Sequence, residues 1–322
     1  MAAMGLSPRR LSSLTGGSLS SLQGVLGSLV LCVLVGGQPD NSSTPSFPDA
    51  NTISFGAEHS CALEHATGAV RCWGSGDQGQ LGDGRSTTSL VPVRVENLKV
   101  AVAVSAGGLH SCAVEASGVV KCWGRGEDGQ LGHGGRSQRS EARPVPYLGL
   151  AANVSAGGSH TCVLERSGSV KCFGWGEFGQ LGDGKTLDSL YPVPILGLGE
   201  VVSLCTGGLH SCVANRLGEV KCWGWGDLGQ LGSNNGTEMS SPMPMPVDGI
   251  EGAVSVACGY QHTCALIRNE TSLEANCFGR ALDNQLQRHD EVWEKSVRRV
   301  MRLDEVLAWS APMPTSPMRS VW

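Results

Sequence analysis

A motif of six residues recurs five times along the chain, and this repeat limits the possible folds more than any other feature. The motif reads Gly-x-x-His-Ser/Thr-Cys, and its copies end at Cys61, Cys112, Cys162, Cys212 and Cys264. The steps between copies are therefore 51, 50, 50 and 52 residues. A fixed period of this length indicates one structural unit that is stacked several times.

Two further anchors follow each copy at a constant phase. A Cys-Trp/Phe-Gly triplet lies at 72–74, 122–124, 172–174, 222–224 and 277–279. A Gly-Gln-Leu-Gly motif lies at 79–82, 129–132, 179–182 and 229–232. In the fifth copy this last motif is replaced by Asn284-Gln285-Leu286-Gln287. Three anchors in phase define four full units and a fifth, weaker one.

Each unit contains the pattern of four short strands. In the second unit, apolar or alternating segments at 101–105, 110–115 and 119–123 are separated by glycine turns. Val145 lies in a fourth segment flanked by proline, which sheets tolerate at an edge. Four strands in about fifty residues are typical of a propeller blade. We expect an all-β propeller with units near 53–103, 104–153, 154–203, 204–255 and 256–311.

Composition agrees with this fold and limits the partners. The chain has 322 residues with 46 glycines, few aromatic residues and a formal net charge of −5. Abundant glycine fits a protein with many tight turns. A negative net charge argues against nucleic acid as the main partner, because binding phosphate requires a basic field. We therefore expect a protein partner, whose identity the sequence does not name.

The anchors resemble the regulator-of-chromosome-condensation repeat family, and the resemblance covers about residues 53–311. The resemblance implies a propeller, but family members typically have seven blades, whereas five units are present here. The ring could close with five blades, be incomplete, or belong to a fragment. One branch of the family exchanges nucleotide on the small GTPase Ran while docked on chromatin. Others are scaffolds, photoreceptors, receptor ectodomains or enzyme inhibitors. The exchange-factor branch matches poorly, because the units are evenly spaced and no basic tail occurs.

The end of the repeat region has the same phase as its start. Residues 300–311 align without gaps on 95–106, with identities that include Val95/Val300 and Leu98/Leu303. We expect this segment to supply a strand that closes the ring and leaves no exposed edge. The alternative is an amphipathic surface helix over 290–308. Residues 312–322 form a C-terminal tail.

The N-terminal 37 residues have the pattern of a signal peptide. Arg9 and Arg10 precede an apolar run at 25–35, which is followed by Gly36 and Gly37. An uncleaved signal anchor is the rival interpretation, and a disordered leader is the simplest one. Residues 38–52 read as a polar linker. We expect a secreted or cell-surface protein, or one that this N-terminal segment anchors to the membrane.

Thirteen cysteines point to the same compartment. Ten of them flank one hairpin in each unit, as the pairs Cys61/Cys72, Cys112/Cys122, Cys162/Cys172, Cys212/Cys222 and Cys264/Cys277. Residues directly opposite on antiparallel strands lie close enough for a disulfide, so we predict one per unit. The alternative is reduced cysteine in the core. Cys205 and Cys258 are candidates for a further pair, although their phases in the repeat differ by one residue.

No catalytic, metal or cofactor site is predicted. One histidine recurs in each unit, at His59, His110, His160, His210 and His262. A ring of histidines suggests a metal site, but such a ring would be too wide for one ion, so we favour a repeated hydrogen bond to the backbone. No nucleophile elbow, phosphate loop or HExxH motif occurs. We expect a non-catalytic protein.

Two aromatic residues are the preferred binding residues. Trp175 and Trp225 lie in glycine-rich loops and are additional to the repeated anchors. Variable segments at 83–90, 133–143, 183–190 and 233–241 are the expected specificity loops. Four glycosylation sequons begin at Asn41, Asn153, Asn235 and Asn269, and Asn153 falls in an expected inner strand. We predict an interaction module that binds through loops on one face. The alternatives are an exchange factor or regulator of a small GTPase, and an inhibitor of a secreted enzyme.

Overall fold

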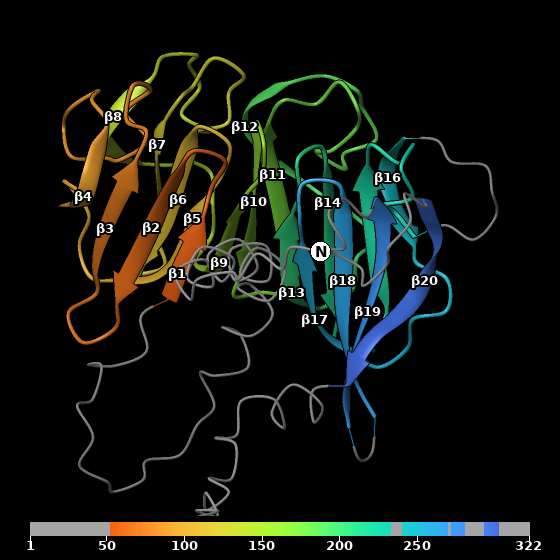
Figure 1. The fold of residues 1–322 in the computed structure, drawn as a ribbon. Helices are drawn as coiled ribbons and strands as arrows, with labels where there is room; N and C mark the ends of the chain where they lie inside the picture. The colour runs from red at the N-terminus through yellow and green to blue at the C-terminus, as the bar shows by residue number, and fades with distance from the viewer. Residues whose placement is uncertain (1–51, 233–239, 270–271, 281–292, 303–322) are drawn as a thin grey trace, which may run out of the picture.

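The structure, a computed structural model, describes residues 52–232, 240–269, 272–280 and 293–302. These residues form five four-stranded sheets and no helix, as predicted (Figure 1). Each sheet is an antiparallel meander whose strands follow chain order. We call the sheets blades 1 to 5. The innermost strands β1, β5, β9, β13 and β17 face the centre, and the fourth strands lie outside.

The strands have the following bounds. Blade 1 contains β1 (Thr52–Phe55), β2 (His59–Glu64), β3 (Ala69–Gly74) and β4 (Ser89–Arg94). Blade 2 contains β5 (Ala101–Ala106), β6 (His110–Glu115), β7 (Val120–Gly124) and β8 (Arg139–Pro144). Blade 3 contains β9 (Ala151–Ala156), β10 (His160–Glu165), β11 (Val170–Gly174) and β12 (Ser189–Pro194). Blade 4 contains β13 (Val201–Thr206), β14 (His210–Asn215), β15 (Val220–Gly224) and β16 (Ser241–Pro246). Blade 5 contains β17 (Ala253–Cys258), β18 (His262–Arg268), β19 (Leu273–Arg280) and β20 (Trp293–Arg302).

Glycine is required where the third strand of a blade ends. Gly124 has φ of 105°, a conformation that residues with a side chain rarely adopt. A Cβ atom there would lie 2.6 Å from the carbonyl oxygen of Leu109. The chain therefore turns from strand to loop in direct contact with the neighbouring turn, which explains the glycine of the Cys-Trp-Gly anchor.

The hydrophobic core lies between consecutive blades. The aromatic residue after the second cysteine of a blade packs against the preceding blade, and Trp123, Phe173, Trp223 and Phe278 are fully buried there. The indole N–H of Trp123 also donates to the carbonyl oxygen of Gln80 in blade 1, at 2.9 Å. This anchor therefore joins blades. Trp73 of blade 1 is only half-buried.

The predicted unit boundaries at 104, 154, 204 and 256 need correction. They fall inside β5, β9, β13 and β17, each of which begins three residues earlier. The first residue of these strands is held by the preceding blade: the N–H of Ala101 donates to the carbonyl oxygen of Gly68 at 2.9 Å. Turn residues with positive φ precede three of these starts, at Asn97, Gly199 and Gly252, so the sequence did carry a signal for them. Val145 likewise lies one residue beyond β8, and its N–H still donates to Val120.

Residues 293–302, near the C-terminal end of the repeat region, form strand β20 and not the alternative surface helix. β20 pairs antiparallel with β19, with Glu274 opposite Arg302 and Arg280 opposite Trp293. Residues 303–311 of the expected closing strand, the leader 1–37 and most of the linker 38–52 lie outside the described residues. Among the described residues no hydrogen bond joins blade 5 to blade 1. Within that same part of the chain there is also no helix long and apolar enough to cross a membrane.

Candidate functional site

The five cysteine pairs expected from the sequence are bonded in the structure. Each joins the second and third strands of one blade, with Cα–Cα distances of 4.0 to 4.1 Å. In blade 2, Cys112 on β6 lies directly opposite Cys122 on β7. The same register brings together the other four bonded pairs, Cys61–Cys72, Cys162–Cys172, Cys212–Cys222 and Cys264–Cys277.

These five disulfides are structural and do not form a binding surface. All ten cysteines are at most 2% exposed. The members on the third strands are each followed by the buried or half-buried aromatic residue of the anchor; they are Cys72, Cys122, Cys172, Cys222 and Cys277. The part of the chain that the structure describes has a central cavity, and none of the ten lines it. The bonds lock the central hairpin of each blade, so the predicted pairing is confirmed while the function has to be sought elsewhere.

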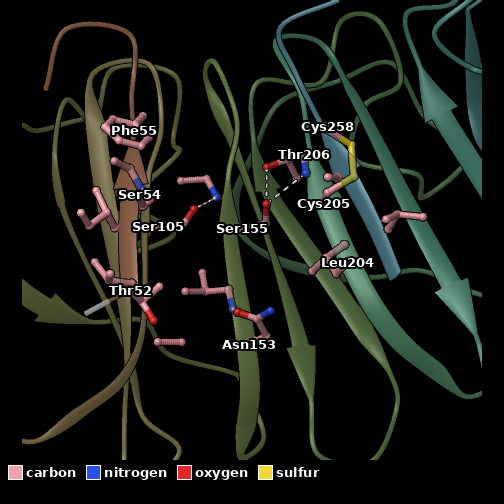
Figure 2. Close-up of a pocket in the computed structure, with 18 of the residues that line it drawn as sticks. Thr52, Ser54, Phe55, Ser105, Asn153, Ser155, Leu204, Cys205, Thr206 and Cys258 are labelled. Atoms are coloured by element: carbon pink, nitrogen blue, oxygen red, sulfur yellow. Dashed lines mark hydrogen bonds between the residues drawn. A yellow bond between two sulfur atoms is a disulfide. The ribbon is translucent and has the colours of Figure 1, made fainter. Parts of the chain in front are cut away.

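A sixth disulfide joins two blades. Cys205 at the inner strand β13 is bonded to Cys258 at the end of β17, with Cα atoms 5.5 Å apart. The difference in phase does not prevent this bond, because neighbouring blades are not held in register by a strand ladder. Both residues line the central cavity, and Cys258 is partly exposed (Figure 2).

The repeated histidines connect consecutive blades. The imidazole Nε2 of His59 lies 2.7 Å from the hydroxyl of Ser111 in blade 2. That hydroxyl donates its proton to the carbonyl oxygen of Gln80 in blade 1, so Nε2–H must be the donor to Ser111. The same arrangement recurs in the pairs His110–Thr161, His160–Ser211 and His210–Thr263. The expected partner was the backbone; the observed one is a hydroxyl of the next blade, which in turn reaches the backbone.

Burial keeps these imidazoles neutral. Desolvation lowers the pKa of His110 to about 3, helped by the neighbouring His59 and His160, and lowers the pKa of His160 to about 4. Nδ1 of each of the two rings has no hydrogen-bond partner. Among the described residues one group has the composition of a metal site, formed by His210, Cys212 and Cys258. Both cysteines are in disulfides, which removes the thiolates that would bind a metal.

The inner strands of all five blades line one cavity of about 310 Å³ (Figure 2). Its wall is held by serine side chains: Ser54 accepts from the N–H of Ala106 at 2.9 Å, and Ser105 accepts from the N–H of Ala156 at 3.0 Å. Asn153, a sequon residue, also lines it. The described lining contains no acidic, basic or histidine side chain, so it offers no group for acid–base chemistry.

A strip of three aromatic rings lies among the loops. The loops after β3, β7 and β11 rise on the upper side of Figure 1, which we call the loop face. There the ring of Phe178 lies 5.4 Å from that of Trp175 and 6.2 Å from that of Trp225, between centroids. Both tryptophans are half-buried. We call Trp175, Phe178 and Trp225 the aromatic strip.

The Gly-Gln-Leu-Gly anchor holds the strip in place. The buried side chain of Gln180 accepts the N–H of Phe178 through Oε1, at 3.0 Å. The N–H of Trp175 donates to the carbonyl oxygen of Ser159 at 2.9 Å. Leu181 beside Gln180 is fully buried. The rings are therefore presented by a backbone that is fixed at both ends.

The strip occurs at one place in the described blades. The positions of Trp175 and Phe178 are occupied by Ser75 and Gln78 in blade 1, and by Arg125 and Asp128 in blade 2. In blade 4, Leu228 takes the place of Phe178 and is buried. The sequence reasoning selected Trp175 and Trp225 but missed Phe178, which lies between them. An aromatic residue where other units have Gln, Asp or Leu was the available signal.

The expected specificity loops have mixed outcomes. The segments 83–90, 133–143 and 183–190 lie between the third and fourth strands of their blades, and each extends into the fourth strand. Most of 233–241 lies outside the described residues, as do the sequons at Asn41 and Asn235.

Repeat anchors, four-stranded blades and sequential sheets together define the family. The model of the RCC1-like domain matches residues 32–313. The chain belongs to the RCC1-like domain family. Over 67 residues it is 43% identical to human RCC1 domain-containing protein 1, and the match covers 20% of this chain and 18% of that protein.

Solved RCC1-like structures share the fold. Human WBSCR16 superposes with a TM-score of 0.68 at 24% identity, covering 83% of this chain and 73% of the other. Yeast RCC1 (Prp20), solved bound to Kap60, gives 0.63 at 22% identity, covering 76% and 59%. A second structure, of Prp20p from Saccharomyces cerevisiae, gives 0.64 at 22% identity, covering 76% and 61%; it was reported with the binding of that protein to Gsp1p and histones. The chain thus spans 18% of the curated relative and about three fifths of Prp20.

Proposed function

We propose that this RCC1-like chain is a non-catalytic interaction propeller that binds protein partners through its loop face. The aromatic strip is the observation that carries the proposal. Aromatic side chains dominate the centres of protein interfaces, because they bury much area with few rotatable bonds. The solved relatives whose reports name protein partners favour the same kind of role.

The rigidity of the strip is a second argument. Trp175 and Phe178 are held by backbone hydrogen bonds to Ser159 and to the side chain of Gln180. Binding costs less when the contact residues are already ordered, since less conformational entropy is lost. The central cavity is the competing surface, but its described lining carries no charged side chain, and its Ser54 and Ser105 hydroxyls already accept hydrogen bonds from the next blade.

We also propose that the protein works in an oxidising compartment, as a secreted or surface-tethered module. Twelve of the thirteen cysteines are in disulfides, and the remaining one, Cys32, lies outside the described residues. Disulfides at this density are typical of extracellular proteins. Thiol counting in denaturant tests this: the native protein should show at most about one reactive thiol, and about ten or more would contradict the proposal.

A double substitution of Trp175→Ala and Trp225→Ala tests the binding role. The full chain, immobilised, should capture partners from the medium of the producing cells, and the double variant should lose them. Leu217→Ala is the matched control, because Leu217 is 82% exposed on the β14–β15 hairpin, at the other end of the blade from the loop face. An unchanged set of captured proteins would rule out the strip as the contact.

A regulator of a small GTPase is the second candidate, supported by the fold shared with Prp20p, which was studied for its binding to Gsp1p. Faster release of a fluorescent guanine nucleotide from a GTPase in the presence of the chain would favour it.

A further inference from the structure

We propose that the aromatic strip recognises a cationic segment of its partner, with arginine preferred over lysine. This inference rests on the proposed function, because it names the chemistry of the partner that binds the loop face. Guanidinium groups would stack on Trp175 and Trp225 while pairing with the carboxylates of Glu177 and Asp227.

An acidic residue occupies the same loop position in four blades. These residues are exposed on the loop face, two positions after Ser75, Arg125, Trp175 and Trp225, and they are Asp77, Glu127, Glu177 and Asp227. Each of these four loops therefore carries a carboxylate two positions after the residue that aligns with Trp175 and Trp225. In blades 3 and 4 that neighbouring residue is a tryptophan.

In blade 2 the acidic residue of this loop is paired with an arginine, whereas, in the part of the chain that the structure describes, its equivalents in blades 3 and 4, Glu177 and Asp227, are not. Arg125 stands where the later blades have tryptophan, and its guanidinium lies 2.6 Å from Glu127 and 3.7 Å from Asp128. Arg136, a second cation in the same β7–β8 connection, pairs with Asp188 of blade 3 at 3.1 Å. Glu177 and Asp227 have no basic partner among the described residues. Carboxylates without a described basic partner and partly exposed aromatic rings therefore lie in the same two loops.

This combination selects a cation with an extended planar surface. The negative face of an indole ring attracts cations within about 6 Å of its centroid. Arginine stacks on such rings and keeps donors free for a carboxylate, while the compact, strongly hydrated ammonium of lysine does less well. Within this protein, Arg125 already pairs with the carboxylate that Glu177 matches in blade 3. An arginine of the partner would therefore pair with Glu177 as Arg125 pairs with Glu127 within blade 2.

Peptide binding to the full chain tests the inference. Three fluorescently labelled peptides of equal length are compared by anisotropy: alternating Arg-Gly, alternating Lys-Gly and alternating Glu-Gly. The Arg-Gly peptide should bind most tightly, the Glu-Gly peptide should not bind, and added salt should weaken the attraction. Trp175→Ala or Trp225→Ala should each reduce affinity about two- to fivefold.

Charge removal at constant shape provides the decisive comparison. Glu177→Gln and Asp227→Asn should each weaken the Arg-Gly peptide about twofold, and more together. Asp77→Asn is the matched control, because Asp77 holds the same repeat position beside Ser75, where no aromatic ring lies; it should have no effect. These substitutions change no buried contact, so a folding defect would not mimic the result.

Two outcomes would overturn the inference, and they differ from failure of the proposed function. Equal weakening by Asp77→Asn and Glu177→Gln, with no effect of the tryptophan substitutions, would indicate diffuse attraction to an acidic surface. Captured partners that depend on Trp175 and Trp225 but not on Glu177 and Asp227 would leave the proposed function standing without a cationic ligand. Captured partners whose binding does not depend on the aromatic strip at all would contradict both this inference and the proposed function.

Discussion

Residues at the same position of the repeat have different environments in different blades, so the effect of burial can be compared between equivalent residues of one chain. Trp123 is fully buried against blade 1 and donates to the carbonyl oxygen of Gln80. Trp73 holds the same position in blade 1 and is half-buried, because no described blade precedes it. The same residue therefore contributes to an interface in one place and to an open face in the other.

Trp123→Ala should destabilise the protein far more than Trp73→Ala. Removing a fully buried tryptophan typically costs about 3–5 kcal/mol in the free energy of unfolding, whereas a half-exposed one loses less transfer energy and leaves no closed cavity. Urea unfolding of both variants measures the difference. Equal losses would mean that the face of blade 1 is covered in solution.

The buried histidines should make stability sensitive to acid. Burial lowers the pKa of His110 to about 3 in the folded state, from 6.5 for an exposed imidazole. Between these two pH values the unfolded chain binds a proton at His110 that the folded chain excludes. The contribution of His110 to the free energy of unfolding is therefore fully present above pH 6.5 and is lost as the pH is lowered towards 3. His110→Gln should reduce the slope of unfolding free energy against pH by about one proton. An unchanged slope would show that His110 titrates normally.

At the scale of strands and hairpins, the six disulfides fall into two kinds. Five close loops of 10 to 13 residues within one hairpin and are buried. The bond between Cys205 and Cys258 closes a loop of 53 residues, joins blades 4 and 5, and lines the cavity. Loop-closure entropy makes the long loop worth about 4 kcal/mol, against about 2.7 kcal/mol for a short one.

The bond between Cys205 and Cys258 should be the first to be reduced under native conditions. Thiolate attack requires access to sulfur, and Cys258 is partly exposed while the hairpin cysteines are not. Mild dithiol treatment, alkylation and peptide mapping should place the first two labels at Cys205 and Cys258. Early labels at any hairpin pair, such as Cys112 and Cys122, would contradict this.

At the scale of the whole molecule, the five blades form a series with two unlike ends. Strands β6, β10 and β14 are buried along their whole length, whereas every second residue of β2 is half-exposed. The hydrogen bonds from histidine to hydroxyl run from blade 1 to blade 5. Blade 1 therefore receives no such bond from any residue that the structure describes.

Amide hydrogen exchange should report this asymmetry. The β2–β3 hairpin of blade 1 should exchange faster than the equivalent β10–β11 hairpin of blade 3, because a sheet packed on one face opens at lower free energy than one packed on both. Mass spectrometry of peptides from 59–74 and 160–174 makes the comparison. Equal protection would show that a segment outside the described residues, or a second chain, covers blade 1.

The sequence by itself determined what lies within a hairpin. The spacing of Cys112 and Cys122 about a glycine turn was enough to place them opposite one another, because antiparallel register is a local property. The same reasoning correctly paired Cys264 with Cys277, although their loop is longer by three residues. The periodic anchors likewise gave the number of blades described and the all-β fold. These features depend on residues about ten positions apart, where the chain leaves few alternatives.

Only the tertiary structure decided what lies between blades. The partner of His59 is a hydroxyl 52 residues away, and Phe178 completes a strip with a tryptophan of the next blade. Cys205 and Cys258, which the sequence offered only as a candidate pair, are bonded although their repeat phases differ. Such contacts depend on how one sheet is placed against the next. That placement results from side-chain packing across the interface, which the period of the sequence does not encode.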